Sequence, residues 1–179
     1  IYINPTLQNP TTRTVSLERR HAIASLAQKY ALTIIEDDPY GLLAPDITPI
    51  ARLAPERVVY ISTFSKCISP GLRSAIVVAP PSLHEAVREA MRATSLMPTP
   101  VWSDLVVGWI EDGTAKRIVQ SVVSESAARM KIARRILPGR VVGGPHGFHV
   151  WLEAPAGWTE QAYTAAAHAQ GVVTVASAT

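Results

Sequence analysis

Three short apolar segments, each followed by polar residues, constrain the fold of this chain more than any other feature. They run over Leu32–Glu36, Val58–Ser62 and Ser74–Ala79. They are rich in β-branched residues and lack the polar alternation of a half-exposed strand, so they predict strands of a sheet that is covered on both faces. A helix is predicted from Ser16 to about Tyr30, ahead of the first of them. The expected fold class is therefore α/β.

Local signals predict the other elements. Ser16 is placed to cap the first helix, and the residues expected to face a core are Leu17, Ala22, Ile23, Leu26 and Ala27. Ser82 and Glu85 form an S-x-x-E capping box, which predicts a helix from Leu83 to about Thr94. Further helices are predicted over residues 98–112, 114–137 and 159–170, and further strands over residues 1–4, 147–153 and 172–175.

Composition excludes several other classes of protein. The chain has 179 residues, of which 47% are hydrophobic and 17% charged, and this excludes intrinsic disorder and a coiled coil. No apolar run approaches the ~18 residues of a membrane span. One cysteine, Cys67, excludes an internal disulfide framework and a multi-cysteine zinc site, and it fits a reducing, cytoplasmic compartment. The net charge of +3, with scattered arginines, does not support a nucleic-acid surface.

Polar residues follow the predicted strands at the edge where α/β sheets bind ligands. They are Asn9, Asp37 and the segment Thr63–Lys66. Lysine is rare in this chain, and an amine in a partly buried site has a depressed pKa and is nucleophilic toward carbonyls. The hydroxyl groups, together with Arg73 seven residues after Lys66, suit a phosphate. The competing interpretation is a surface lysine beside loop hydroxyls.

Three consecutive carboxylates, Glu36, Asp37 and Asp38, end the strand that begins at Leu32. They repel one another unless a cation lies near. A solvated loop or a helix cap is the plainest interpretation, and paired carboxylates for hydrolysis or a metal site are rivals. The five histidines show no ligand-like pattern, so no metal site is predicted; they are His21, His84, His146, His149 and His168.

Four motifs in register resemble the cofactor site of the fold-type-I pyridoxal-phosphate enzymes, the aminotransferase superfamily. Those proteins carry an N-P-T segment, then D-x-x-Y after a buried strand, then S/T-x-S-K, then an arginine. This chain has Gln8–Thr11, Asp37–Tyr40, Thr63–Lys66 and Pro70–Arg73 in the same order and spacing. One departure is Thr12, which stands where the superfamily usually has glycine. The loop backbone is expected to differ there, since glycine tolerates conformations that threonine does not.

The region from Trp102 to Leu152 resembles one branch of this superfamily, the MocR-type transcriptional regulators of the GntR family. In those proteins a winged-helix DNA-binding domain is fused to an aminotransferase-like domain. The similar residues are Trp109–Ala115, Glu125, Arg129 and His149–Pro155. Standalone aminotransferases of the 2-aminoadipate and kynurenine type are close relatives of that branch.

The resemblance implies a role for each matching residue. Lys66 would form the internal imine with the pyridoxal aldehyde, and would later act as the general base at the substrate α-carbon. Asp37 would pair with the pyridine nitrogen and keep it protonated. Tyr40 and Asn9 would hydrogen-bond the ring hydroxyl oxygen. The phosphate would be held by Thr63, Ser65 and Arg73. Glu36 and Asp38 match no cofactor role.

The resemblance also implies a partial fold of two parts. Residues 1–113 would be the carboxy-terminal half of the cofactor-binding large domain, with the second half of its sheet. Residues 114–179 would be the connecting helix and most of the small α+β domain, truncated. The chain starts at Ile1 and opens and ends on predicted strands, as expected of a fragment. The phosphate loop, the ring-stacking aromatic residue and the arginine that grips the substrate carboxylate would then lie outside it.

Three functions follow as hypotheses. The first is a regulator that senses pyridoxal phosphate or an amino compound through an imine at Lys66. The second is a standalone amino-acid aminotransferase, and the third is an α/β fragment that binds nothing. Because Lys66 suits both of the first two, enzymatic activity stays open. The intact protein is expected to be a cytoplasmic homodimer that binds an amino acid or amine, touches DNA only through an upstream domain, and does not associate with membranes. The fragment is expected to retain pyridoxal phosphate weakly or not at all.

Overall fold

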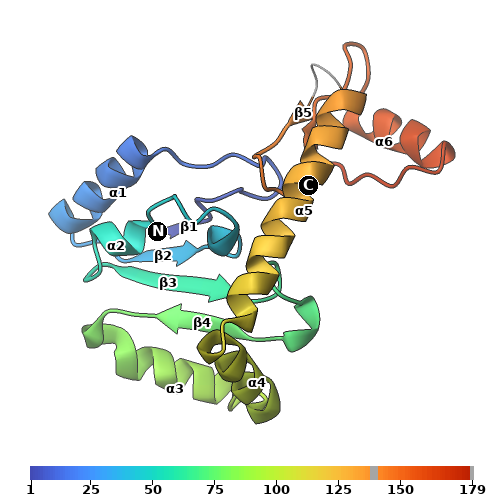
Figure 1. Cartoon of the computed structure of the whole chain (residues 1–179). Helices are drawn as coiled ribbons and strands as arrows, with labels where there is room; N and C mark the ends of the chain where they lie inside the picture. Colours follow the sequence, from blue (N-terminus) through green and yellow to red (C-terminus); the bar gives the residue numbers. More distant parts are fainter. Residues whose placement is uncertain (138–140, 178–179) are drawn as a thin grey trace.

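A mixed four-stranded sheet organises the chain in the computed structural model, which describes residues 1–137 and 141–177 (Figure 1). The strands are β1 (Tyr2–Ile3), β2 (Ile34–Asp37), β3 (Val58–Thr63) and β4 (Ala75–Val78), in the spatial order β1-β2-β3-β4. β1, β2 and β3 run parallel to one another, and β4 is antiparallel to β3. The predicted α/β class and the positions of the strands are confirmed.

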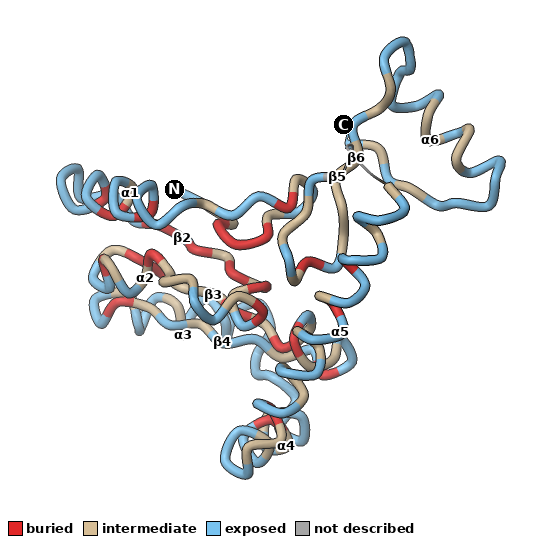
Figure 2. Tube along the Cα trace, turned by 45° about the horizontal axis from the view of Figure 1, so that its top comes forward, coloured by how far each residue is buried: buried red, intermediate tan, exposed pale blue. Residues whose placement is uncertain are grey.

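Two helices cover one face of this sheet. They are α1 (Leu17–Lys29) and the short α2 (Ile50–Leu53), and their buried residues form a core with β2 and β3. The members of this core are Ala24, Ala27, Ile34, Ile50, Ala54 and Val58. Figure 2 shows the buried residues gathered along β2, β3 and the facing sides of α1 and α2. Other apolar residues of the sheet are solvent-exposed, among them Ile35, Ile76 and Val78, so the covering predicted for both faces is incomplete in this chain.

The capping of α1 is confirmed, and its predicted core face is right only in part, since Ala27 is buried and Ile23 packs against the core but Ala22 is exposed. The Ser16 hydroxyl accepts a hydrogen bond from the backbone N–H of Arg19, at 3.3 Å. The buried residues of α1 are Arg20, Ala24 and Ala27, whereas Leu17 and Leu26 are exposed. The helix therefore presents small side chains and one arginine to the core.

Two helices follow β4. A 3₁₀ turn, η3 (Pro81–Leu83), leads into α3 (His84–Ser95), and α4 (Pro100–Glu111) follows. The predicted capping box is wrong, since no side chain caps α3. The pair Pro80-Pro81 fixes the backbone of a 3₁₀ turn, and Ser82 lies inside that turn instead of ahead of the helix.

The long helix predicted over residues 114–137 is confirmed as the 23-residue α5 (Thr114–Ile136), which passes the carboxyl ends of β2 and β3 (Figure 1). It leads to a two-stranded sheet, β5 (Val141–Val142) and β6 (Trp151–Leu152), and to α6 (Glu160–Ala169). Thr159 caps α6, and Gly171, at φ +78°, follows its end. The strand predicted over residues 147–153 is shorter, and the one predicted over residues 172–175 is absent from the described part of the chain. The predicted end of the long helix at Pro138 lies outside the described residues.

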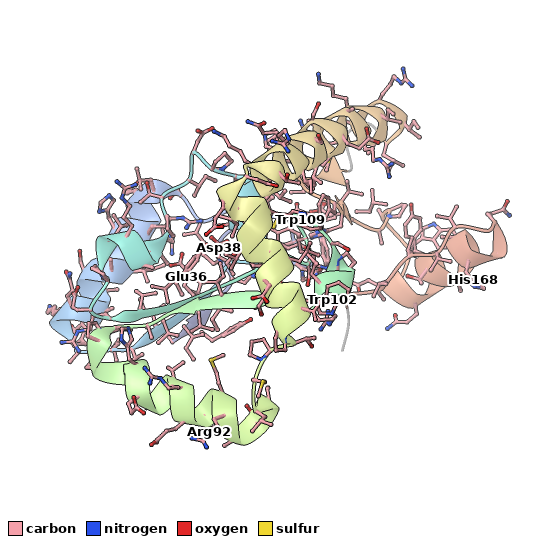
Figure 3. All side chains as sticks on the ribbon, turned by 60° about the horizontal axis from the view of Figure 1, so that its bottom comes forward. Glu36, Asp38, Arg92, Trp102, Trp109 and His168 are labelled. Carbon is pink, nitrogen blue, oxygen red and sulfur yellow. The ribbon has the colours of Figure 1, made fainter. Side chains whose placement is uncertain are left out.

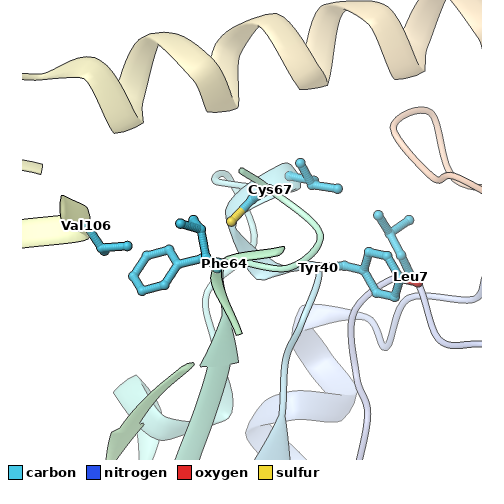
Figure 4. Packing of buried hydrophobic residues seen from close by; sticks show 7 residues of the cluster. Leu7, Tyr40, Phe64, Cys67 and Val106 are labelled. Atoms are coloured by element: carbon cyan, nitrogen blue, oxygen red, sulfur yellow. The ribbon is translucent and has the colours of Figure 1, made fainter. Parts of the chain in front are cut away.

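A second core lies at the carboxyl edge of the sheet, under α4 and α5. Its buried members are Leu7, Tyr40, Leu43, Phe64, Cys67, Leu72 and Val106, several of which are seen from close by in Figure 4. They come from the loops that follow β1, β2 and β3, and from α4. This core therefore fixes the three loops that carry the four motifs beside one another. Among the described residues, no helix is long and apolar enough to cross a membrane.

Candidate functional site

The predicted site residues Asp37 and Lys66 lie at the same edge of the sheet. Strands β2 and β3 are parallel neighbours, with Asp37 in register with Ile61. The next residue, Asp38, donates its backbone N–H to the Ile61 carbonyl oxygen at 2.8 Å. Since Asp37 is the last residue of β2 and Lys66 follows the end of β3 by three residues, both residues lie at the carboxyl ends of adjacent strands. This edge is where α/β sheets bind ligands.

The loop after β3 gathers two hydroxyl groups around one backbone turn. The Thr63 hydroxyl oxygen accepts the backbone N–H of Ser65 at 3.1 Å, and it lies 3.1 Å from Ser65 Oγ. Arg73 directly follows the 3₁₀ turn η2 (Pro70–Leu72) and has a left-handed backbone, at φ +48°. The side chains of Lys66 and Arg73 are exposed, and no hydrogen bond or ion pair engages either one within residues 1–137 and 141–177.

Asp37 has two partners that link β1 to the end of β2. Its Oδ2 accepts a hydrogen bond from the Tyr2 hydroxyl at 2.5 Å, and its backbone carbonyl accepts from Asn4 Nδ2 at 2.8 Å. The hydrogen bond to Asp37 raises the pKa of the Tyr2 hydroxyl. Tyr2 was not predicted as a site residue. Its place beside Asp37 depends on the register in which Tyr2 pairs with Ile35, which puts Tyr2 and Asp37 on the same side of the sheet, and the sequence does not give this register.

Tyr40 is buried where the loop after β2 meets the segment between β5 and β6. Its ring makes an edge-on contact with Phe148, with centroids 6.1 Å apart, and a tilted contact with His149 at 5.9 Å. Burial raises the pKa of the Tyr40 hydroxyl. The predicted cofactor-facing tyrosine is therefore packed against residues that follow the long helix α5.

Asn9 lies in the loop between β1 and α1, and its side chain is exposed. In this loop Thr12 has a φ of +60°, the left-handed conformation that glycine adopts without cost. The expectation that threonine would change this backbone conformation is therefore not supported. Thr12 is buried and its hydroxyl lies 3.0 Å from the Val142 carbonyl oxygen, a contact that offsets the cost of roughly 1–2 kcal/mol for a left-handed residue with a side chain.

Glu36 and Asp38 are not solvated, so the solvated-loop interpretation is wrong, but the helix-cap interpretation holds for Glu36, whose carboxylate accepts the backbone N–H groups of Ile50 and Ala51 at the start of α2. The exposed fractions of Glu36 and Asp38 are 0% and 3%, and Figure 3 places both in the body of the sheet, away from the peripheral Arg92 and His168. The cation beside these two buried carboxylates is Arg20, which is also fully buried, with 3.5 Å between Arg20 Nη1 and Glu36 Oε1. Burial raises the pKa of both Glu36 and Asp38. No group of three or more potential metal ligands occurs in the part of the chain that the structure describes.

Cys67 follows the predicted catalytic lysine, but it is fully buried in the second core. Burial raises the pKa of its thiol to about 11, so almost no thiolate exists near neutral pH. We expect iodoacetamide to leave Cys67 unmodified in the folded protein at pH 8 and to alkylate it fully in urea, as measured by intact mass. Rapid alkylation of the folded protein would contradict the burial of this thiol.

The fold and this edge define a class of protein. Three parallel strands and one antiparallel strand, with a carboxylate after the second strand and a lysine after the third, constitute part of the pyridoxal-phosphate transferase fold. A solved structure of kynurenine aminotransferase from Pyrococcus horikoshii superposes with a TM-score of 0.82 at 28% identity, over 97% of this chain and 46% of that one.

The chain belongs to the aminotransferase class I and II family, whose profile matches residues 3–175. It is 31% identical over 157 residues to YdeF of Bacillus subtilis, an uncharacterised HTH-type transcriptional regulator, covering 87% of this chain and 34% of YdeF. It is 30% identical over 173 residues to the 2-aminoadipate transaminase of Thermus thermophilus, covering 88% of this chain and 43% of that enzyme. The chain thus spans less than half the length of these relatives.

Proposed function

We propose that this chain is the lysine-bearing part of a pyridoxal-phosphate site in the aminotransferase-like domain of a GntR/MocR-type transcriptional regulator. The observation that carries the proposal is the presentation of Asp37 and Lys66 at the carboxyl ends of two adjacent parallel strands. The similarity to YdeF favours a regulator. Such a domain would sense pyridoxal phosphate or an amino compound, in a protein that acts as a cytoplasmic homodimer and contacts DNA through another domain.

The side chains at this edge fit pyridoxal phosphate by their chemistry. Its phosphate suits the hydroxyls of Thr63 and Ser65 and the guanidinium of Arg73. Within the described residues, that guanidinium has no hydrogen-bond or ion-pair partner. The uncommitted amine of Lys66 is suited to its aldehyde. The Asp37 carboxylate, held by Tyr2, is suited to a protonated ring nitrogen.

In the proposed site each residue has one task. When bound, the cofactor supplies an electron sink for bonds at the carbon that bears the amino group. Lys66 would hold the cofactor covalently and then move a proton at that carbon. Asp37 would keep the ring nitrogen protonated, while Tyr40 and Asn9 would donate hydrogen bonds to the ring oxygen. Thr63, Ser65 and Arg73 would bind the phosphate.

The proposed site belongs to the first of two proposed parts, residues 1–113 and 114–179. The boundary falls at Gly113, whose φ of +78° separates α4 from α5. Under this proposal the chain by itself retains pyridoxal phosphate weakly or not at all, so tests of binding use the protein at its natural length.

A covalent trapping experiment tests the proposal. We expect borohydride reduction of the natural-length protein with pyridoxal phosphate, followed by digestion, to place a phosphopyridoxyl group on the peptide that contains Lys66. Lys66→Ala is expected to abolish this product and the visible absorbance of the bound cofactor. Lys116→Ala, which removes an exposed lysine on α5, is the matched control and is expected to behave as the wild type. Unchanged absorbance in Lys66→Ala would overturn the proposal.

A standalone amino-acid aminotransferase is the second candidate function. The similarity to 2-aminoadipate transaminase favours it, and the proposed roles of Lys66 and Asp37 are the same in both functions. The sequence on the amino-terminal side of Ile1 in the natural protein separates the two. A basic winged-helix domain there would favour the regulator, and a direct start into an aminotransferase small domain would favour the enzyme.

A further inference from the structure

The guanidinium of Arg20 is buried and fully hydrogen-bonded, and the proposed function assigns it no role. Arginine has five N–H donors, and here every one faces an acceptor. Nε donates to the Val15 carbonyl at 3.0 Å, and Nη2 donates to the Pro5 carbonyl at 2.9 Å and to the Thr6 hydroxyl at 3.0 Å. Nη1 donates to the Thr48 carbonyl at 3.3 Å and to Glu36 Oε1 at 3.5 Å.

Two of these acceptors are the two ends of one loop. The backbone N–H of Val15 donates to the Pro5 carbonyl at 2.8 Å, which closes the loop at its base. Arg20 reaches both of these residues from α1 and so clamps the closed base. Asn9, a proposed cofactor ligand, lies in this loop. The position of Asn9 therefore depends on a side chain that lies outside the site.

The remaining charged partner, Glu36, fixes the end of β2. Its carboxylate accepts the backbone N–H of Ile50 at 2.9 Å and that of Ala51 at 2.7 Å, in addition to its contact with Arg20. Glu36 is the residue before Asp37, the proposed partner of the ring nitrogen. One buried ion pair thus connects the segments that carry two proposed cofactor ligands.

We propose that Arg20 is a positioning residue for the cofactor site, which clamps the Asn9 loop and holds it in register with the strand end that carries Asp37. This inference rests on the proposed function. The alternative is an ion pair that contributes to stability alone. Lysine at position 20 separates the two, because it keeps the charge for Glu36 but has only three donors on one nitrogen and cannot span both Val15 and Pro5.

The first measurement tests whether Arg20 holds the loop closed, and it needs no cofactor. Limited trypsin digestion cuts after Arg13, an exposed residue inside the loop, only when the loop opens. We expect Arg20→Lys to speed cleavage at Arg13 roughly ten-fold, since hydrogen bonds from a charged donor are lost. Arg19→Lys changes the exposed neighbour on the same helix and is expected to cleave as the wild type. Equal rates in both variants would overturn the clamp.

The second measurement determines the affinity for pyridoxal phosphate and the pH dependence of its absorbance in the natural-length protein. We expect Arg20→Lys to weaken pyridoxal-phosphate binding roughly ten-fold and to change the pH dependence of the visible absorbance of the bound cofactor. Ala24→Gly, one turn along α1 in the same core, is the control for lost stability and is expected to keep the wild-type pH dependence. An Arg20→Lys variant with the wild-type affinity and pH dependence would overturn the positioning role.

The two measurements distinguish a failure of the proposed function from a failure of the inference about Arg20. If the wild-type protein never acquires the absorbance of bound cofactor, the proposed function fails, and the positioning role fails with it. Faster cleavage at Arg13 in Arg20→Lys would then still show that Arg20 anchors the loop. If the wild type binds pyridoxal phosphate but Arg20→Lys leaves both cleavage and affinity unchanged, only the inference about Arg20 fails.

Discussion

Replacing Glu36 with alanine is expected to destabilise the folded chain by about 3–5 kcal/mol, the cost typical of breaking a buried ion pair by removing one partner. The change leaves Arg20 fully buried without its counter-charge. It also leaves the backbone N–H groups of Ile50 and Ala51 without their acceptor. Since domains are stable by only about 5–15 kcal/mol, a loss of this size unfolds a large share of the molecules under mild denaturing conditions.

Urea unfolding followed by circular dichroism measures this effect. Glu36→Gln keeps an oxygen acceptor and nearly the same volume, and we expect it to be less destabilising than Glu36→Ala. Glu18→Ala removes an exposed carboxylate from the first turn of α1 and is expected to change the free energy of unfolding by no more than about 0.5 kcal/mol. A Glu36→Ala variant as stable as Glu18→Ala would show that the pair contributes little to stability.

Helix α1 illustrates why one part of the fold could be predicted and another could not. The start and end of the helix follow from local signals, a serine cap and a helical run of residues, and both are confirmed. The predicted buried face was wrong at Leu17 and Leu26, because hydropathy favours leucine as a core residue while the face that packs carries Arg20. Its acceptors come from Val15, Pro5 and Glu36, and only the tertiary fold brings these together.

In the candidate site, too, some features could be predicted from the sequence and others could not. Continuous runs of β-branched residues locate the strands, and parallel pairing then places the residues after them at one edge, so the location of Asp37 and of Thr63–Lys66 could be predicted. The side chains that support them could not. Tyr2 reaches Asp37 from the neighbouring strand β1, and Asp38 has hydrogen-bond partners in Thr6 and Tyr60, which lie far from it in the sequence. The spacing of residues within a motif does not predict such long-range contacts.

The charge at position 37 should decide how the bound cofactor titrates. Under the proposed function, Asp37→Asn removes the anion beside the ring nitrogen while keeping the side-chain volume. An opposite charge at contact distance changes a protonation equilibrium by about 10- to 1,000-fold, so the proton-binding constant of the ring nitrogen is expected to fall by that factor. The measurement is a pH titration of the visible absorbance of the bound cofactor in the natural-length protein, compared with Asp46→Asn, which removes an exposed loop carboxylate.

A substitution at Tyr2 tests the role of Asp37 with a smaller perturbation than Asp37→Asn. Its hydroxyl donates to Asp37 Oδ2 at 2.5 Å and, under the proposed function, orients the carboxylate toward the ring nitrogen. Tyr2→Phe keeps the carboxylate charge and removes only this hydrogen bond, which is worth about 1.5–3 kcal/mol when the acceptor is charged. We therefore expect the titration of Tyr2→Phe to fall between those of the wild type and Asp37→Asn. An Asp37→Asn protein that titrates as the wild type would place the ring nitrogen elsewhere and remove the electronic role of Asp37.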